Sequence, residues 1–406
     1  MTNTEAETAD WLLTPEAVRA QCRALFDHAM AGRLSHFSVQ MDRLPAAADL
    51  VCQVIHDNYP TLQVPPHARW RHFVMDGEDR WAPVAASLAG DAMERARVEC
   101  ELAITSVLLD AGAGPDWKYR DEKSGRYLKR SEGLAIASLD LYLGGAFSPA
   151  SPEATHADAA GLGGFSAKAL ASGFQVSADN PLEGLEGRAA LIARLAGCLA
   201  GQPLVFGSAN PRLGNIADCL MTHVADGQLE ARTILITLLH ALGQIWPGRP
   251  EMAGRNLGDT WAHPLAPDNG LVPFHKLSQW LTYSLFEPMQ KLDVKIVRQD
   301  ALTGLAEYRN GGLFLDIGVL ALKNPAQAAI SQAPGSELVV EWRALTVCLL
   351  DKVASLVREQ LGKTASEMPL ASILEGGTWA AGRRIANQLR TDGSPPIAII
   401  SDGSVF

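Results

Sequence analysis

Two ionisable residues in apolar stretches, Lys276 and Glu307, are the strongest candidates for chemistry in this sequence. Lys276 lies in the first turns of a helix predicted for VPFHKLSQWLTYSLFEPM, and Glu307 lies in LTGLAEYRNGG, a mostly apolar run. A carboxylate and an ammonium group brought together away from water shift each other's pKa. Such a pair can transfer a proton or stabilise a cation. We therefore expect both side chains to converge on one pocket.

Asp316 is the second carboxylate of interest because it interrupts the apolar run LFLDIGVL. A charge in such a run is expected to be paired or to line a site. Asp316 is therefore either a further catalytic carboxylate or a buried partner of Arg309. The neighbouring residues Glu307, Tyr308 and Arg309 can also be interpreted as a cluster on the exposed surface of a helix. Lys276 can likewise be interpreted as a solvated lysine in a first helical turn.

A loop and a helix start between residues 116 and 133 form a candidate binding element. Ser131 is predicted to cap the helix, and its free amides with Arg130 beside them suit a phosphate or a urea-like carbonyl. Capping alone also explains Ser131. Trp117 and Tyr119 are candidates for the walls of a pocket, although a tryptophan in a loop is often a packing anchor.

Composition limits the class of protein. The chain has 406 residues, 47% of them hydrophobic, and a net charge of −10, which indicates a globular protein without a general nucleic-acid surface. Its six cysteines contain no C-x-x-C pair and are expected to be reduced core residues. The polar N-terminus is unlike a signal peptide and no apolar run is long enough to span a bilayer, so we expect a cytoplasmic protein.

Metal and cofactor motifs are weak. His67 and His72 are five positions apart, and no pair of histidines forms H-x-x-x-H or H-E-x-x-H. The glycine-rich stretch 161–164 has neither a preceding strand nor a P-loop lysine. We expect neither a metal nor a nucleotide cofactor.

Helical periodicity dominates the chain. Thr14-Pro15 is typical of a cap followed by proline at the first helical position. Apolar spacing predicts further helices near 45–58, 92–110, 131–143, 186–201, 213–225, 229–245, 273–289 and 338–361. The Pro-, Ala- and Gly-rich stretch 148–164 marks a loop or a boundary, so residues 1–406 form one extended helical domain or two closely packed lobes. Short β-like runs occur at 338–342, where helix competes, and at 396–406.

Several long stretches resemble the uracil-catabolism protein family of fungi and bacteria, formerly a domain of unknown function. The resemblance extends over nearly the whole chain and is carried by PPHARWRHF (65–73), SVLLDAGAGPDWKY (106–119), RSEGLAIASLD (130–140), RNLGDTWAHP (255–264), VPFHKLSQWLTYSLFEPM (272–289), LTGLAEYRNGGLFLDIGVL (302–320) and EWRAL (341–345).

A second resemblance concerns the candidate site. Lys276-x-x-Gln279 followed by LTGLAEYR is similar to the Lys-x-x-Gln and Leu-Thr-x-x-Ala-Asp-Tyr-Arg pattern of queuosine-salvage proteins. Those proteins hydrolyse an N-glycosidic bond on a helical scaffold like that of DNA glycosylases, and Glu307 stands where they have Asp. The resemblance implies a mainly α, DNA-glycosylase-like fold, a catalytic role for Glu307 and Lys276, and substrate contacts from Gln279, Tyr308 and Arg309.

Together the resemblances imply an N-glycosidic hydrolase in uracil breakdown. Its substrate would be a ribosylurea-type phosphoribosyl intermediate, cleaved to urea and ribose phosphate without a cofactor. Two alternatives remain open: an amidohydrolase acting on the opened uracil ring, and a non-catalytic partner that associates with the ring-opening enzyme.

Overall fold

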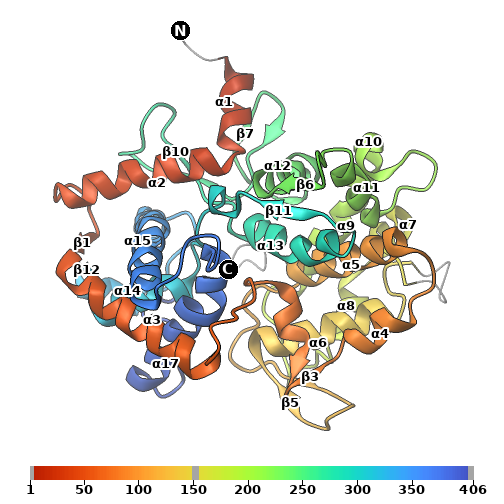
Figure 1. The fold of residues 1–406 in the computed structure, drawn as a ribbon, viewed down its shortest axis with the longest axis horizontal. Helices are drawn as coiled ribbons and strands as arrows, with labels where there is room; N and C mark the ends of the chain where they lie inside the picture. Colours follow the sequence, from red (N-terminus) through yellow and green to blue (C-terminus); the bar gives the residue numbers. More distant parts are fainter. Residues whose placement is uncertain (1–3, 149–154, 401–406) are drawn as a thin grey trace. The chain divides into compact units, whose positions relative to one another are not determined.

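The computed structural model describes residues 4–148 and 155–400, and the chain folds into two compact units (Figure 1). Among the described residues, the first unit comprises 4–67, 249–279 and 298–400, and the second comprises 68–148, 155–248 and 280–297. Helices account for 56% of the structure and the strands form only small two-stranded sheets, so the predicted mainly α class is confirmed. No helix within the described ranges combines the length and apolar character needed to cross a membrane.

The first unit is built from helices and three antiparallel strand pairs. Its helices are α1 (Glu5–Leu12), α2 (Pro15–Met30), α3 (Leu44–Asn58), α14 (Tyr308–Ile317), α15 (Glu337–Leu361), α16 (Leu370–Ile373) and α17 (Trp379–Leu389), with a π-helical turn at Leu374–Thr378. Its strands are β1 (Phe37–Val39) with β12 (Leu320–Leu322), β7 (Glu251–Met252) with β8 (Arg255–Asn256), and β9 (Thr260–Ala262) with β10 (Leu271–Pro273).

The second unit has more short elements. Its helices are α4 (Ala82–Ser87), α5 (Ala92–Leu108), α6 (Arg130–Leu143), α7 (Ala159–Gly164), α8 (Ala167–Gly173), α9 (Leu185–Gly201), α10 (Pro203–Phe206), α11 (Ile216–Met221) and α12 (Ala231–Leu242). Its strand pairs are β2 (Val74–Met75) with β3 (Glu78–Asp79), β4 (Tyr119–Arg120) with β5 (Tyr127–Leu128), and the parallel pair β6 (Gln228–Glu230) with β11 (Lys295–Val297). Helix α13 (Lys276–Gln290) begins in the first unit and continues in the second.

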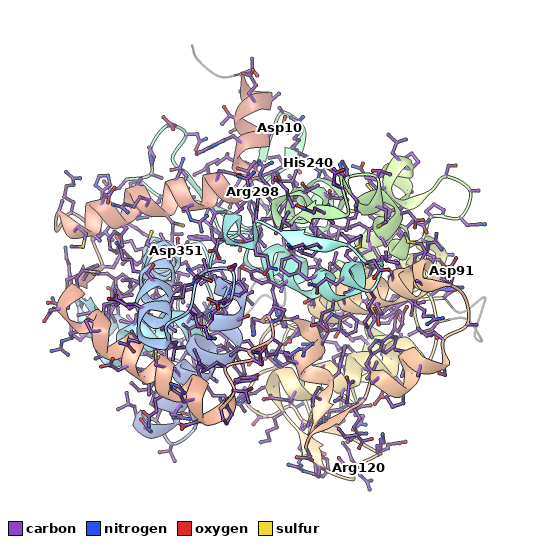
Figure 2. All side chains as sticks on the ribbon, in the orientation of Figure 1. Asp10, Asp91, Arg120, His240, Arg298 and Asp351 are labelled. Carbon is purple, nitrogen blue, oxygen red and sulfur yellow. The ribbon has the colours of Figure 1, made fainter. Side chains whose placement is uncertain are left out.

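Local signals set most helix boundaries. The Thr14 hydroxyl accepts a hydrogen bond from the Ala17 amide at 3.1 Å and Pro15 is the first residue of α2, as predicted. Asp91, labelled in Figure 2, caps α5 by accepting from the Glu94 amide at 2.8 Å. The run 338–342 is helical, because it continues the apolar stripe of α15.

Three expectations need adjustment. The predicted helix at 213–225 is shorter, because α11 ends at Met221 after a 3₁₀ turn. Within 148–164, residues 159–164 form α7 inside the second unit, and 149–154 lie outside the described residues. Of the β-like run 396–406, Ile399 forms a single bridge with Gln332, and residues 401–406 lie outside the described residues.

Helix α15 is the centre of the first unit. It packs against α2, α3 and α14, and α14 packs against α17 (Figure 1). Most of its first fourteen residues are buried, including the charged residues Glu341 and Arg343. Burying charge on a central helix is unfavourable unless each charge has a partner. Glu341 and Arg343 are therefore expected to have partners on other elements of the first unit.

The second unit has a comparable buried carboxylate on α5. Glu101 has no exposed surface and accepts hydrogen bonds from the Tyr142 hydroxyl at 2.9 Å, the Gly214 amide at 3.0 Å and Arg212 Nε at 2.5 Å. Burial raises the pKa of Glu101, and the Arg212 charge acts against that rise. This carboxylate joins α5, α6 and the 3₁₀ turn before α11, and we assign it a structural role.

Candidate functional site

A buried ion pair between Asp259 and Arg343 is the centre of the candidate site in the first unit. Arg343 Nη1 and Nη2 donate to the two carboxylate oxygens of Asp259 at 2.7 and 2.6 Å, and both residues are buried. Burial alone raises the pKa of Asp259, but the charge and hydrogen bonds of Arg343 outweigh burial and hold that pKa well below its usual range. Asp259 is therefore a fixed negative charge at neutral pH.

This ion pair connects the two sequence segments that carry Lys276 and Glu307. Asp259 Oδ2 accepts a hydrogen bond from the Lys276 amide at 3.1 Å, at the first residue of α13. On the other side, Arg343 Nε donates to the carbonyl of Ala306 at 3.1 Å, one residue before Glu307. The backbones at Lys276 and at Ala306 are thus held by opposite ends of one Asp–Arg pair.

Gln279 makes a second connection between the same segments. Its amide nitrogen donates to the Thr303 hydroxyl at 2.6 Å and to the Phe274 carbonyl at 3.1 Å, and its oxygen accepts from the Thr303 amide at 2.8 Å. Gln279 has no exposed surface. Both N–H donors of the side-chain amide are used by these contacts. Because two of the three bonds go to Thr303, Gln279 positions the start of α13 against residues 302–305.

Strained backbone immediately precedes Lys276. His275 has φ +48°, in the left-handed region that non-glycine residues rarely adopt. Its ring is buried, Nε2 lies 2.8 Å from the Leu12 carbonyl, and burial lowers the pKa of His275, so the ring is neutral and donates to that carbonyl. Strained backbone of this kind is concentrated at functional sites because surrounding contacts must hold it in place.

Glu307 caps helix α14. Its carboxylate oxygens accept from the Arg309 amide at 2.8 Å and the Asn310 amide at 2.6 Å, and only 8% of the residue is exposed. The N-terminal amides of a helix carry partial positive charge and stabilise a carboxylate. The alternative of a surface cluster does not describe Glu307, because this carboxylate is buried. Each oxygen retains a second lone pair for a water or a cationic group.

The residues that follow Glu307 are also mostly enclosed. Arg309 is 5% exposed, donates from Nη1 to the Gly393 carbonyl at 2.8 Å, and lies over the Tyr308 ring at 5.1 Å. The Asn310 amide nitrogen donates to the Leu305 carbonyl at 3.0 Å, and its oxygen accepts from the Thr378 hydroxyl at 2.8 Å. These contacts fix the first turn of α14, and with it the position of the Glu307 carboxylate.

Asp316, at the far end of α14, has a partner other than the one considered from sequence. Arg390 donates from both terminal nitrogens to its two carboxylate oxygens, at 2.8 and 2.5 Å. Arg309 instead bonds the backbone at Gly393. A bidentate Arg–carboxylate pair is a strong, oriented interaction. It joins the C-terminal end of α14 to the residue that follows α17.

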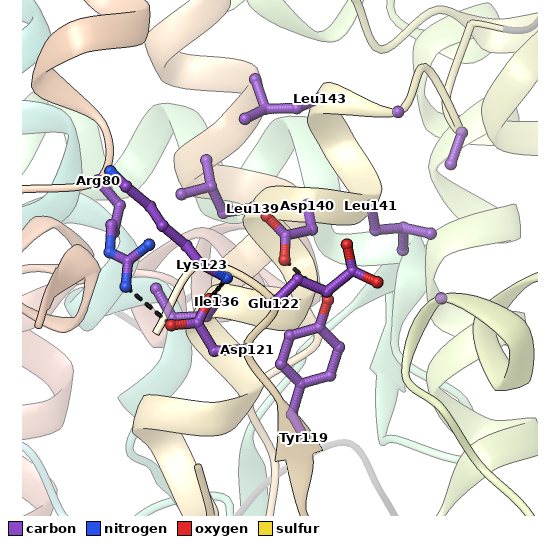
Figure 3. Close-up of a pocket in the computed structure, with 13 residues that line it drawn as sticks. Arg80, Tyr119, Asp121, Glu122, Lys123, Ile136, Leu139, Asp140, Leu141 and Leu143 are labelled. Carbon is purple, nitrogen blue, oxygen red and sulfur yellow. Dashed lines mark hydrogen bonds and ion pairs between the residues drawn. The ribbon is translucent and has the colours of Figure 1, made fainter. Parts of the chain in front are cut away.

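Tyr119 lines a pocket of about 580 Å³ in the second unit (Figure 3). Its hydroxyl donates to Asp140 at 2.7 Å, and Arg80 pairs with Asp121 at 2.7 Å on the same wall. Removal from water raises the pKa of Tyr119, and the hydrogen bond to Asp140 adds to that rise. The wall carries three carboxylates, from Asp121, Glu122 and Asp140, against two cations, from Arg80 and Lys123. That balance suits a neutral or cationic group better than a phosphate.

The other residues predicted between 116 and 133 have different surroundings. Trp117 is fully buried, donates from Nε1 to the Phe174 carbonyl at 3.0 Å and packs on the Phe174 ring. These contacts are those of a tryptophan that anchors the packing of its loop. The prediction that Ser131 caps a helix is wrong. Helix α6 begins at Arg130, whose φ is +54°, and Lys129 occupies the cap position, so Ser131 lies inside the first turn.

Lys276, Gln279, Glu307, Tyr308 and Arg309 all belong to the first unit. Hydrogen bonds of Asp259, Arg343 and Thr303 connect the two segments that carry them. The predicted residues Trp117, Tyr119, Arg130 and Ser131 belong to the second unit. Sequence reasoning missed the residues that connect the first group, which are Asp259, Thr303 and Arg343. All three could have been suspected, because each lies within a stretch that carries the family resemblance.

The fold and these contacts define a mainly α-helical protein with a buried polar network around a capping carboxylate. The chain belongs to the family described as "Protein of unknown function (DUF1688)", whose model matches residues 11–406. It is 40% identical over 410 residues to "Protein urg3" of Schizosaccharomyces pombe, covering 98% of this chain and 99% of that protein. It is 35% identical over 429 residues to "Uracil catabolism protein 4" of Lachancea kluyveri, covering 96% and 97%. The predicted family is confirmed, and its members include a protein named for uracil catabolism.

Proposed function

We propose that this protein is an N-glycosidic hydrolase of uracil catabolism that cleaves a ribosylurea-type phosphoribosyl intermediate to urea and ribose phosphate. The observation that carries the proposal is the buried Glu307 carboxylate, oriented by two helix amides and connected through Arg343 and Asp259 to the backbone of Lys276. The name of the Lachancea kluyveri relative supports the pathway.

The chemistry assigned to Glu307 follows from the bond to be broken. Cleavage at the anomeric carbon passes through a cation with oxocarbenium character, and a nearby carboxylate stabilises that charge. The same carboxylate accepts a proton from the attacking water, whose oxygen bonds to the anomeric carbon as the C–N electron pair leaves with the urea nitrogen. The proton that Glu307 has taken up is then passed to that nitrogen, which releases neutral urea and restores the carboxylate. The two amides that bind Glu307 keep its oxygens oriented through the reaction.

Lys276 is assigned to the leaving group or the phosphate. An ammonium group is a compact cation with three donors, suited to either anionic oxygen. Gln279 is a positioning residue in this proposal, because its amide is bonded to Thr303 and Phe274. Tyr308 and Arg309 are proposed to border the substrate from the first turn of α14.

The test is release of both urea and ribose phosphate from phosphoribosylurea by the purified protein. Glu307→Gln deletes the charge while keeping the shape, so turnover should fall by about 10²-fold or more. Glu359→Gln, an exposed glutamate near the end of α15, is the control and should keep wild-type turnover. Glu307→Asp should retain partial activity if the shorter carboxylate can be accommodated.

Asp316→Asn separates the two candidate carboxylates. Because Arg390 binds both oxygens of Asp316, this substitution should affect stability more than turnover. Full activity in Glu307→Gln contradicts the mechanism. Urea produced without free sugar phosphate indicates an amidohydrolase instead. If the wild-type protein releases neither urea nor ribose phosphate, the non-catalytic alternative is favoured.

A further inference from the structure

A second cluster of ionisable side chains lies in the first unit and has no part in the proposed hydrolysis. It consists of His36, just before β1, and Glu337 and Glu341, which are four residues apart and share a face at the start of α15. One potential ligand atom from each lies within 4.8 Å of the others. Two atoms bound to one ion at about 2.0–2.2 Å each are at most about 4.4 Å apart. The cluster is therefore within a small side-chain adjustment of a coordination site.

The histidine in this cluster is oriented as metal ligands usually are. His36 Nδ1 lies 3.1 Å from the side-chain oxygen of Gln327, an acceptor, so Nδ1 carries the proton. The lone pair is then on Nε2 and available for a metal. In most protein metal sites the second ring nitrogen of a histidine ligand donates to a carboxylate, a carbonyl or water, which fixes the tautomer and the ring orientation.

Glu341 is held equally firmly. Its two oxygens accept the amides of Ser35 and His36 at 2.9 and 3.0 Å, and the residue has no exposed surface. Each oxygen keeps one further lone pair. These bonds join the start of α15 to the backbone of the histidine that completes the cluster.

An independent observation comes from His263, which follows β9. Its Nδ1 accepts the Leu265 amide at 3.1 Å, so the ring proton is on Nε2. Nε2 lies 3.7 Å from Glu341 Oε1, too far for a hydrogen bond, and has no hydrogen-bond partner within the described part of the chain. The His263 side chain is completely buried. A buried N–H donor without an acceptor is costly, and a metal-bound water beside Glu341 would satisfy it.

We propose that His36, Glu337 and Glu341 bind one divalent transition-metal ion, of the class of Mn²⁺ or Zn²⁺, with His263 donating to a water in its coordination sphere. One imidazole and two carboxylates suit these ions. Three protein ligands leave at least one coordination position for that water. Because the ligands come from residues 36, 337 and 341, no short spacing motif reveals the site.

The proposal is tested by titrating the full-length, chelator-stripped protein with MnCl₂ and, separately, ZnCl₂ by isothermal titration calorimetry. The expected result is saturable binding of one ion per chain. His36→Ala and Glu337→Gln should each weaken binding by more than about 10-fold, and Gln327→Leu should weaken it by about 10-fold through the lost orientation of His36. Glu359→Gln, on the same helix but exposed, should bind as the wild type does.

Electron spin-echo measurements on the Mn²⁺-loaded protein give a second readout. They should detect nitrogen coupling that His36→Ala abolishes, and circular dichroism establishes that each variant is folded. Saturable binding that His36→Ala leaves unchanged would show adsorption to carboxylates and overturn the proposal, as would absence of saturable binding of both ions to the wild type. The readout is metal affinity, so the result is independent of the proposed glycosidic activity.

Discussion

Substitution of Asp259 by asparagine tests whether the buried ion pair holds the candidate site together. The Asp259 carboxylate accepts hydrogen bonds from Arg343 at 2.7 and 2.6 Å, from Trp261 Nε1 at 2.7 Å and from the Lys276 amide at 3.1 Å. Asparagine keeps the shape but removes the carboxylate charge that both terminal nitrogens of the buried Arg343 bind. Removing one partner of a buried ion pair costs about 3–5 kcal/mol.

The assay is hydrogen exchange of peptides covering residues 255–280 and 302–312. A loss of about 3–5 kcal/mol corresponds to exchange that is faster by roughly two to three and a half powers of ten when the pair controls local opening, since about 1.4 kcal/mol is a factor of ten. Asp27→Asn is the control, because its pair with Arg23 is exposed and contributes about 0.5 kcal/mol or less. The double variant Asp259→Asn/Arg343→Met should recover part of the loss, since both charges of the pair are then removed.

The pH dependence of this effect has a definite sign. The pKa of Asp259 is lower in the folded than in the unfolded chain, so its contribution is present above the unfolded value of about 3.9 and is lost as pH falls through the folded value. The difference between wild type and Asp259→Asn should therefore stay constant from neutral pH down to mildly acidic pH and shrink only in strong acid. Exchange in 302–312 that Asp259→Asn alters no more than Asp27→Asn does would refute the connecting role.

Three further predictions concern other parts of the fold. Removal from water raises the pKa of Asp140, so the folded state is less stable at a pH where this carboxyl is ionised. Asp140→Asn should therefore stabilise the protein more at pH 8 than at pH 4 in thermal unfolding. Equal effects at both pH values would contradict this. Gly382→Ala should destabilise by about 1–3 kcal/mol in urea unfolding, because its Cβ would lie 2.1 Å from the Arg309 carbonyl, whereas Gly197→Ala in α9 meets nothing within 4 Å and should stabilise by about 0.5–1 kcal/mol. Thr14→Ala should cost about 1 kcal/mol through loss of the α2 cap, and an unchanged urea midpoint would argue against it.

Predictions that depended on short-range physics were largely confirmed. Helical periodicity located α3, α5, α6, α9 and α15 to within a few residues, because apolar spacing and local propensity act over one or two turns. The cap at Thr14 followed from a hydroxyl beside a proline. Ser131 shows the limit of this reasoning. The cap position is Lys129, two positions before Ser131, and Arg130 has a left-handed backbone of which the sequence gives no sign.

The sequence by itself determined the helical class, the family and the two residues, Lys276 and Glu307, around which the functional proposal is built. Tertiary structure decided their surroundings. Arg343 is 84 positions from Asp259, and Arg390 is 74 positions from Asp316. Partners at such separations leave no periodic trace in the chain, because a buried charge is satisfied by whichever element the packing brings beside it. For the same reason the cluster of His36, Glu337 and Glu341 became visible only when β1 was placed against the start of α15.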